Sequence, residues 1–111
     1  MADIDFAGKV AVVTGASRGI GRTLVLALAE HGATVVGTAR QLDTSPGTGG
    51  TLRETFDALE AAGGKGMPLP VDITREQGAK YLIDRTVQTY GKIDILINNA
   101  GVYPEGQIAE T

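Results

Sequence analysis

The sequence predicts an α/β fold built on a doubly wound parallel sheet. Short apolar runs alternate with amphipathic stretches along the chain, and a glycine-rich turn joins the first run to the first stretch. This alternation is typical of βαβ units, in which helices connect parallel strands. The length of 111 residues suits one domain with a single core. We therefore expect one domain of alternating strands and helices.

The first strand and helix flank the glycine-rich turn. Residues 9–14 form an apolar run that predicts a strand, and residues 19–31 have the spacing of an amphipathic helix. Gly32 follows at a position where a left-handed cap ends many helices. Apolar side chains at helical spacing give this helix its expected buried face: Ile20, Leu24, Ala27 and Leu28.

A long loop separates the second strand from the second helix. Residues 34–39 predict the strand, and residues 41–50, rich in threonine, glycine and proline, predict the loop. Thr51 and Glu54 have the spacing of a capping box that opens a helix. This helix should stop at the glycines 63–64 and bury three side chains on one face: Leu52, Phe56 and Leu59.

Residues 66–71 predict a third strand and residues 93–97 a fourth. Between them, residues 74–77 offer another helix cap, and the helix should end before Gly91. Its expected inward face carries six side chains: Ala79, Leu82, Ile83, Thr86, Val87 and Tyr90.

Right-handed crossovers would order these four strands 3-2-1-4, with a ligand crevice between strands 1 and 4. The expected architecture is a Rossmann-like parallel sheet that is incomplete, with four strands. The glycine-rich turn leaves strand 1, so we expect it to lie at this crevice.

That turn reads TGASRGIG over residues 14–21 and has the features of a phosphate-binding loop. Because they lack Cβ atoms, Gly15, Gly19 and Gly21 let the backbone turn sharply, approach a pyrophosphate and pack the helix on its strand. The helix start adds unpaired N–H groups and the positive end of the helix dipole. Ser17 could bond a phosphate or cap the helix. The alternative is an ordinary tight turn before a helix.

A second motif follows the fourth strand. Residues 94–97 read as a buried strand and run into the sequence NNAG at residues 98–101. Together, TGASRGIG and NNAG resemble the short-chain dehydrogenase/reductase family, and the resemblance covers the whole chain. It implies an oxidoreductase that transfers hydride between a nicotinamide dinucleotide and an alcohol or carbonyl substrate.

In that family the catalytic serine and a Tyr-x-x-x-Lys pair lie beyond the point where this sequence stops. The resemblance therefore implies that this chain is the N-terminal, cofactor-binding half and is inactive alone. Tyr81, Tyr90 and Tyr103 lack a lysine four positions later; the first two fall on the inward helix face, the third near the crevice. His31 has no acid or serine placed to make it a base. We predict no catalytic residue in this chain.

The resemblance also implies contacts with the cofactor. Residues 71–73 match a family triplet whose aspartate binds the adenine amino group, although Asp72 could instead favour the dipole of the following helix. Residues 99–101 match the segment that supports strand 4 and lines the cofactor ribose. We interpret Asp94 as structural. The expected cofactor-binding residues are Gly15, Ser17, Arg18, Gly19, Ile20, Gly21, Arg40, Asp72, Ile73, Asn99, Ala100 and Gly101.

The end of strand 2 favours NADP over NAD. An NAD site presents a carboxylate to the adenosine ribose there, whereas this strand ends in small residues and no acidic residue follows until Asp43. Arg40 can offer a guanidinium fork to a 2′-phosphate. In NADP-dependent members of the family a basic residue often stands where Arg18 stands here. The alternative is that both arginines are solvated cations without a phosphate partner.

Composition narrows the expected partners. A net charge of −3 gives no broad basic surface, which argues against nucleic acid and anionic membranes as partners. With no cysteine and a single histidine, the chain cannot build a disulfide or a cysteine zinc site. Residues 1–9 lack the order of a signal peptide, so we expect a cytoplasmic protein. The expected partners are the dinucleotide and, in the complete enzyme, a small alcohol or carbonyl substrate.

Two other functions stay open. The chain could be a non-catalytic dinucleotide-binding module, or an interaction protein that uses the open edge of its sheet. Strand 4 would leave apolar side chains such as Ile95 and Ile97 exposed at that edge. The same edge predicts a homo-oligomer or an aggregation-prone chain.

Overall fold

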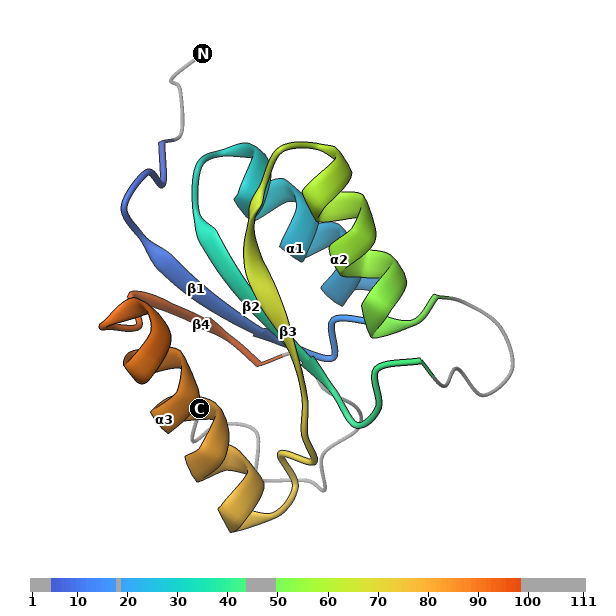
Figure 1. Ribbon diagram of the computed structural model, residues 1–111, viewed down its shortest axis with the longest axis vertical. Helices are drawn as coiled ribbons and strands as arrows, with labels where there is room; N and C mark the ends of the chain where they lie inside the picture. Colours follow the sequence, from blue (N-terminus) through green and yellow to red (C-terminus); the bar gives the residue numbers. More distant parts are fainter. Residues whose placement is uncertain (1–4, 18, 44–49, 99–111) are drawn as a thin grey trace.

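The computed structural model describes residues 5–17, 19–43 and 50–98 of the chain. In these segments strands and helices alternate, with the helices on both faces of one sheet (Figure 1). The elements are β1 (Val10–Thr14), α1 (Gly19–Glu30), β2 (Thr34–Ala39), α2 (Leu52–Ala61), β3 (Lys65–Pro70), α3 (Glu76–Tyr90) and β4 (Ile95–Ile97). Among the described residues, no helix combines the length and apolarity needed to cross a bilayer.

The sheet has the order β3-β2-β1-β4, and each neighbouring pair of strands is parallel. This confirms the predicted order and the Rossmann-like fold class. α1 and α2 cover one face of the sheet, and α3 lies on the other (Figure 1). All strands therefore end at one common edge, which we call the carboxyl edge, and begin at the opposite amino edge.

Alternating side chains of the central strands divide the core into two clusters. In β1, Val13 packs with α1 and α2, while Val12 packs toward α3. Every residue of β1 is buried, as expected for a strand covered on both faces. The cluster beside α1 and α2 is the larger, and it includes Val25, Leu28, Val35, Leu52, Phe56 and Leu59.

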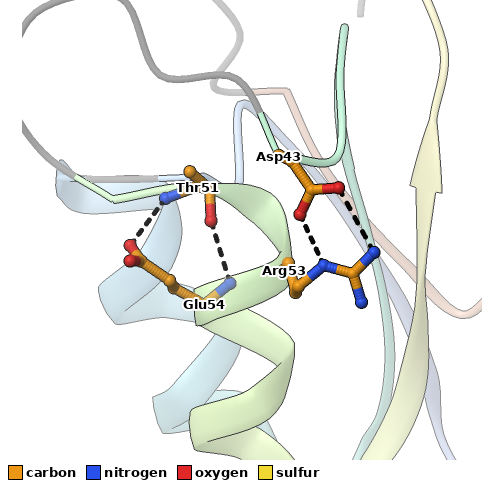
Figure 2. A network of polar contacts seen from close by, with 4 residues as sticks. All are labelled: Asp43, Thr51, Arg53 and Glu54. Atoms are coloured by element: carbon orange, nitrogen blue, oxygen red, sulfur yellow. Dashed lines mark hydrogen bonds and ion pairs between the residues drawn. The ribbon is translucent and has the colours of Figure 1, made fainter.

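The predicted caps of α1 and α2 are confirmed. Gly32 has φ 102° and Gly63 has φ 83°, both in the left-handed region where glycine is favoured. Thr51 and Glu54 form the capping box: the Glu54 N–H donates to Thr51 Oγ1 over 3.1 Å, and the Thr51 N–H donates to Glu54 Oε1 over 3.0 Å (Figure 2). The chain thus contains the signals that fix where these helices stop and start.

The predicted buried face of α1 is confirmed at Leu28, which is buried, and at Leu24, which packs partly against the core, but not at its two other residues. Ile20 is 70% exposed and Ala27 is exposed, whereas Gly21, Val25 and Leu28 are buried. Gly21 lies on the face toward the sheet but carries no side chain, so a search for apolar side chains cannot detect it. The apolar spacing was therefore assigned to Ile20, its exposed neighbour.

The start of α3 also differs from the prediction. Thr74 does not cap this helix, because its hydroxyl donates to the carboxylate of Asp72. The helix begins at Glu76, and its N-cap residue Arg75 makes no side-chain capping bond. The end of the helix is as predicted, since Gly91 adopts a left-handed conformation with φ 88°.

The inward face of α3 is narrower than predicted. Leu82 and Thr86 are buried, but Ile83 and Val87, expected on that face, are 39% and 42% exposed. Tyr81 is exposed as well, contrary to the prediction. Among the described residues α3 is the only helix on its side of the sheet, so a single stripe of side chains is enough to contact the strands.

The edge strand β4 begins at Ile95, two residues later than predicted. Asp94 lies just before the strand: its N–H donates to the Val10 carbonyl over 2.8 Å, but the Val10 N–H donates to the Asp94 carboxylate and not to a carbonyl of β4. Ile95 and Ile97, expected to be exposed, pack partly against the cluster beside α1 and α2. Leu96, which points to the opposite face, is 52% exposed instead.

Candidate functional site

The two sequence motifs meet at the carboxyl edge of the sheet. β1 and β4 are neighbours, so the glycine-rich turn after β1 and Asn98 after β4 begin side by side. The Thr14 hydroxyl links them, because it lies 3.0 Å from Asn98 Oδ1 and 3.5 Å from the Ile97 carbonyl. The expected convergence of the motifs is confirmed, and Asn98 is a contact that the predicted site omitted.

The glycine-rich turn has the backbone geometry of a cradle. Gly15 has φ 65° and Gly19 has φ 60°, values that residues with a Cβ rarely adopt. A Cβ on Gly19 would meet no described atom within 4 Å, so the space beside this residue is open among the described residues. Gly21 is buried against the sheet, as close packing of helix and strand requires. Ser17 is half-buried within the turn.

The rear of this turn is held by β2 and α2. The Ala16 N–H donates to the Thr38 carbonyl over 2.9 Å, and the Thr55 hydroxyl donates to the Ala16 carbonyl over 2.8 Å. Ala16 and Thr55 are both fully buried. Sequence reasoning missed Thr55; the available signal was a hydroxyl on the otherwise apolar face of α2, one turn after the capping residue.

Close packing behind the turn requires a glycine in β2. A Cβ on Gly37 would lie 2.7 Å from the Phe56 ring and 2.8 Å from the Ala16 methyl group. The turn, β2 and α2 therefore touch without space for a further atom. This packing leaves the turn little freedom to move backward.

An exposed cation, Arg40, lies at the end of β2, and the nearest acidic residue in the following loop is paired with another arginine. Arg40 follows directly after β2 and is exposed. Asp43, the first acidic residue after this strand, forms a two-point ion pair with Arg53 on α2, in which Arg53 Nη2 lies 3.3 Å from Asp43 Oδ2 (Figure 2). The hydrogen bond from Arg53 holds the pKa of Asp43 below its usual range. Asp43 is thus bound to α2.

Asp72 forms a turn at the end of β3. Its Oδ1 accepts from the N–H of Thr74 over 3.0 Å and from the Thr74 hydroxyl, while Oδ2 lies 3.5 Å from Arg75 Nε. The hydroxyl and N–H of Thr74 lower the pKa of Asp72, and the positive charges of Arg40 and Arg75 add to this effect. The carboxylate is therefore ionised and close to Arg40, with Oδ2 less engaged than Oδ1.

Asp72 binds Thr74 in the turn before α3, which begins at Glu76. Both roles that the sequence left open for its carboxylate, contact with adenine and interaction with the helix dipole, stay predictions. A Cβ on Gly78, in the first turns of α3, would lie 2.0 Å from the Asp72 carbonyl, so helix and turn are packed without a gap. Ile73 packs partly against the cluster beside α3. Both residues of the predicted adenine site are consequently held in fixed positions.

Asp94 lies at the amino edge, opposite the site. Its Oδ2 accepts from the Val10 N–H over 2.8 Å and from Lys92 Nζ over 3.2 Å. The Val10 N–H lowers the pKa of Asp94 more than burial raises it, and Lys92 lowers it further. These contacts support the structural interpretation of Asp94.

The tyrosines of α3 lie away from the site. Tyr90 ends α3 near the amino edge, and partial burial raises the pKa of its hydroxyl. Arg18, residues 99–101 and Tyr103, all assigned to the site or its surroundings, lie outside the described residues. Within the described part of the chain, no group of three or more His, Cys, Asp or Glu side chains could hold a metal ion.

A shallow hollow of about 320 Å³ lies between α2 and β3, lined by Leu42, Arg53, Phe56 and Pro68 among others. None of the predicted cofactor residues lines this hollow. The two motifs meet elsewhere, at the carboxyl edge, where Thr14 contacts Asn98.

Comparison with protein families gives one match over nearly the whole chain. The family described as short chain dehydrogenase matches residues 9–111. Hydroxysteroid dehydrogenase-like protein 2 of Xenopus tropicalis is 40% identical over 105 residues, which are 95% of this chain and 25% of that protein. An uncharacterized oxidoreductase of Methylorubrum extorquens is 41% identical over 103 residues, 93% of this chain and 39% of that protein.

Solved structures show the same arrangement. A short chain dehydrogenase from Mycobacterium thermoresistibile superposes with a TM-score of 0.82 at 33% identity, over 96% of this chain and 38% of that chain. A metagenomic short-chain oxidoreductase in complex with NADP superposes with a TM-score of 0.78 at 37% identity, over 90% of this chain and 42% of that chain. The chain thus spans between 25% and 42% of the length of these four proteins.

Proposed function

This chain belongs to the short-chain dehydrogenase family, and we propose that it binds NADP at the carboxyl edge of its sheet as the cofactor-binding part of an oxidoreductase. The observation that carries the proposal is the glycine-rich turn, in which Gly15 and Gly19 both have positive φ directly before α1. When bound, the nicotinamide ring donates or accepts a hydride.

The turn and the start of α1 would hold the pyrophosphate. Main-chain N–H groups at a helix N-terminus have no partner within the helix, and the helix dipole favours an anion there. No side chain from Gly19 or Gly21 obstructs this approach, and Ser17 adds a hydroxyl. The open space in front of Gly19 fits a group that needs close contact with the backbone.

The preference for NADP over NAD is supported by three observations. Arg40 is exposed at the end of β2, where it could pair with a 2′-phosphate. Asp43 is paired with Arg53, so it is not presented to a ribose hydroxyl. A relative that is 37% identical was solved in complex with NADP.

The adenine would lie beside Asp72 and Ile73 at the end of β3. Asp72 is ionised and its Oδ2 has only a 3.5 Å approach from Arg75, so this oxygen could accept from the adenine amino group. The turn with Thr74 holds the carboxylate in place. Its local role and a ligand role are therefore compatible.

We further propose that substrate binding and acid–base chemistry belong to parts of the fold that this sequence does not contain. None of Tyr81, Tyr90 and Tyr103 is followed by a lysine four residues later. A general acid or base contributes roughly 10²- to 10⁴-fold to a rate, so the chain alone should show negligible turnover. The substrate would be a small alcohol or carbonyl compound.

Titration of the chain with NADP and with NAD tests the proposed cofactor. We expect tighter binding of NADP, and Arg40→Ala should weaken NADP at least about tenfold while leaving NAD nearly unchanged, since one charge-assisted contact is lost. Lys80→Ala is the matched control, because Lys80 is an exposed cation on α3 paired only with Asp84 on the same helix surface among the described residues. An unchanged NADP-to-NAD ratio in Arg40→Ala would remove the NADP assignment.

A second candidate, an interaction protein, is favoured by the β4 side of the sheet, which no further strand covers among the described residues. The β3 side is less suited to pairing, because Pro68 and Pro70 lack the N–H that another strand would need. β4 has the sequence Ile-Leu-Ile, with Leu96 half exposed. Sedimentation of the chain and of Leu96→Asp tests this function: association that Leu96→Asp abolishes would support it, and a monomeric chain would exclude it.

A further inference from the structure

We infer that Thr55 of α2 is a positioning residue for the glycine-rich turn, and that its hydroxyl orients the peptide bond between Ala16 and Ser17 for the cofactor phosphates. This inference rests on the proposed function, because the phosphates are those of the proposed dinucleotide. Thr55 lies outside both sequence motifs and belongs to a different helix from the one that begins at the turn.

The Thr55 hydroxyl has one proton and three carbonyl groups near it. The Ala16 carbonyl is closest at 2.8 Å, while the carbonyls of Ser17 and Thr51 are each 3.3 Å away. The Thr51 carbonyl belongs to the preceding turn of the same helix, where threonine hydroxyls often bond. Here the shortest contact goes instead to the glycine-rich turn. Thr55 is fully buried, so water does not compete for this bond.

Fixing the Ala16 carbonyl also fixes an N–H group. A trans peptide is planar, and its C=O and N–H point in opposite directions. Because the Ala16 carbonyl points to Thr55, the N–H of Ser17 points away from α2. Without the hydroxyl, this peptide could rotate and withdraw the N–H from that direction.

The other contacts of Ala16 do not fix the orientation of its carbonyl, so the Thr55 hydroxyl is the group that does. The Ala16 N–H is held by the Thr38 carbonyl of β2, and its methyl group packs against Gly37. These contacts place the residue but do not engage its carbonyl. The Thr55 bond therefore adds the orientation that packing alone does not supply.

The start of α2 is itself seated on the turn, which gives Thr55 a fixed base. The capping box of Thr51 and Glu54 defines the first turn of α2 (Figure 2). The Thr55 N–H donates to the Thr51 carbonyl over 3.1 Å. A Cβ on Gly50 would lie 2.9 Å from the Ser17 carbonyl and 2.5 Å from Arg22 Nη1. The segment that leads into α2 thus lies close to the turn at Ser17 and to α1 at Arg22.

Variants of Thr55 in the full chain separate the hydroxyl from the packing of the side chain. Thr55→Val keeps the shape and removes the hydroxyl, whereas Thr55→Ser keeps the hydroxyl and removes the methyl group. Titration with NADP should show about tenfold weaker binding for Thr55→Val and a change within about threefold for Thr55→Ser. Thr55→Ala, which also lacks the hydroxyl, replaces Thr55→Val if the latter does not fold.

Thr86→Val is the matched control. Thr86 is also fully buried in a helix, but the hydrogen bond of its hydroxyl is to the Leu82 carbonyl within α3. Removing it costs one buried hydrogen bond far from the turn, so NADP affinity should stay within about twofold of the parent chain. Equal losses in Thr86→Val and Thr55→Val would overturn the positioning role in favour of a general loss of stability.

Amide hydrogen exchange supplies a readout that does not need the cofactor. Thr55→Val should speed exchange at Ser17 relative to the amides of β1, whereas Thr55→Ser should not. Two results overturn the inference: Thr55→Val that binds NADP within about twofold of the parent chain, or Thr55→Ser that loses as much affinity as Thr55→Val. If the parent chain does not bind NADP, the proposed function fails, and the exchange rates still decide whether Thr55 orients the turn.

Discussion

The amino edge and the carboxyl edge of the sheet are stabilised by different kinds of contact. At the amino edge, polar groups satisfy one another: the Asp94 carboxylate accepts from the Val10 N–H and pairs with Lys92. At the carboxyl edge, the glycine-rich turn is bonded from behind by Thr38 and Thr55, and the space beside Gly19 is open among the described residues. Side chains at the amino edge bind one another, whereas the turn at the carboxyl edge is bonded only from behind, so that we expect a ligand to approach it from the front.

This difference separates residues that stabilise the fold from residues that bind. At the amino edge, the Asp94 carboxylate binds the Val10 N–H and Lys92, and so holds the start of β1 beside β4. Glycines with positive φ at the carboxyl edge make no side-chain contacts. Replacing one of them by a residue with a Cβ would lower the stability of the fold, because such residues rarely adopt positive φ. Substitutions at the amino edge should therefore change unfolding, and substitutions at the carboxyl edge should change affinity.

The largest expected effect is that of Gly19→Ala on cofactor affinity. A Cβ there would enter the space where we place the pyrophosphate and would strain a residue with φ 60°. We expect NADP to bind about a hundredfold more weakly, equivalent to losing about one hydrogen bond to a charged group. Calorimetric titration measures this loss.

Gly63→Ala is the control for backbone strain. Gly63 has φ 83°, and a Cβ there would also meet nothing within 4 Å, but it lies at the end of α2. Both substitutions should lower the free energy of unfolding by about 1–2 kcal/mol, and only Gly19→Ala should weaken NADP. Equal affinities of the two variants would break the distinction between the edges.

Arg40→Ala follows in size, with the loss of at least about tenfold in NADP affinity given above. It sharpens the comparison because Arg40 lies at the carboxyl edge and makes no packing contact that the core needs. Its urea unfolding midpoint should match that of the parent chain. A lower urea midpoint with unchanged NADP affinity would mean that Arg40 stabilises the fold and does not bind the cofactor.

Asp94→Asn should change stability and leave affinity intact. The folded-state pKa of Asp94 is lowered by the Val10 N–H and Lys92, so its carboxylate stabilises the fold above the unfolded pKa of about 3.9. This contribution is lost as the pH falls through the lowered folded pKa. The parent chain should have the higher urea midpoint at pH 7, and the difference should shrink at pH 3. A variant that weakens NADP more than about threefold at pH 7 would contradict the structural role.

The smallest expected effect is that of Asp43→Ala. The Asp43–Arg53 pair is largely exposed, and exposed ion pairs contribute little to stability. The melting temperature should change by about 2 °C or less, and the NADP-to-NAD ratio should stay the same. A shift of the ratio toward NADP would mean that Asp43 contacts the ribose of NAD after all.

Much of the fold could be predicted from the sequence because its signals are local. Apolar runs gave the strands, and the spacing of Thr51 and Glu54 gave the capping box that the structure contains. The order of the strands followed from the handedness of crossovers, which is a property of the backbone and holds for many sequences.

The errors arise at residues whose type does not indicate whether they are buried or exposed in the fold. Gly21 is buried without an apolar side chain, so the prediction placed its exposed neighbour Ile20 on the buried face of α1. Ile83 and Val87 of α3 are apolar but exposed, because among the described residues only a narrow stripe of this helix contacts the sheet. Periodicity reports which side chains are apolar, and it does not report which neighbours are present.

The sequence predicted the motifs of the candidate site, but it did not predict the residue on α2 that bonds the glycine-rich turn from behind. The glycine-rich turn and the residues after β3 lie at the carboxyl edge as expected. Thr55 was missed because its partner, Ala16, is 39 residues away in the sequence. A threonine on an apolar helix face is compatible with simple packing, and only the three-dimensional contact shows the bond to the turn.

Chemical-shift mapping during an NADP titration tests the central claim most directly. In ¹H–¹⁵N spectra of the chain, the amides of Gly15, Ser17, Gly19 and Gly21 should shift on addition of NADP, while those of Val10 and Asp94 at the amino edge should not. Shifts confined to the amino edge, or no shift at the glycine-rich turn at saturating NADP, would contradict the account.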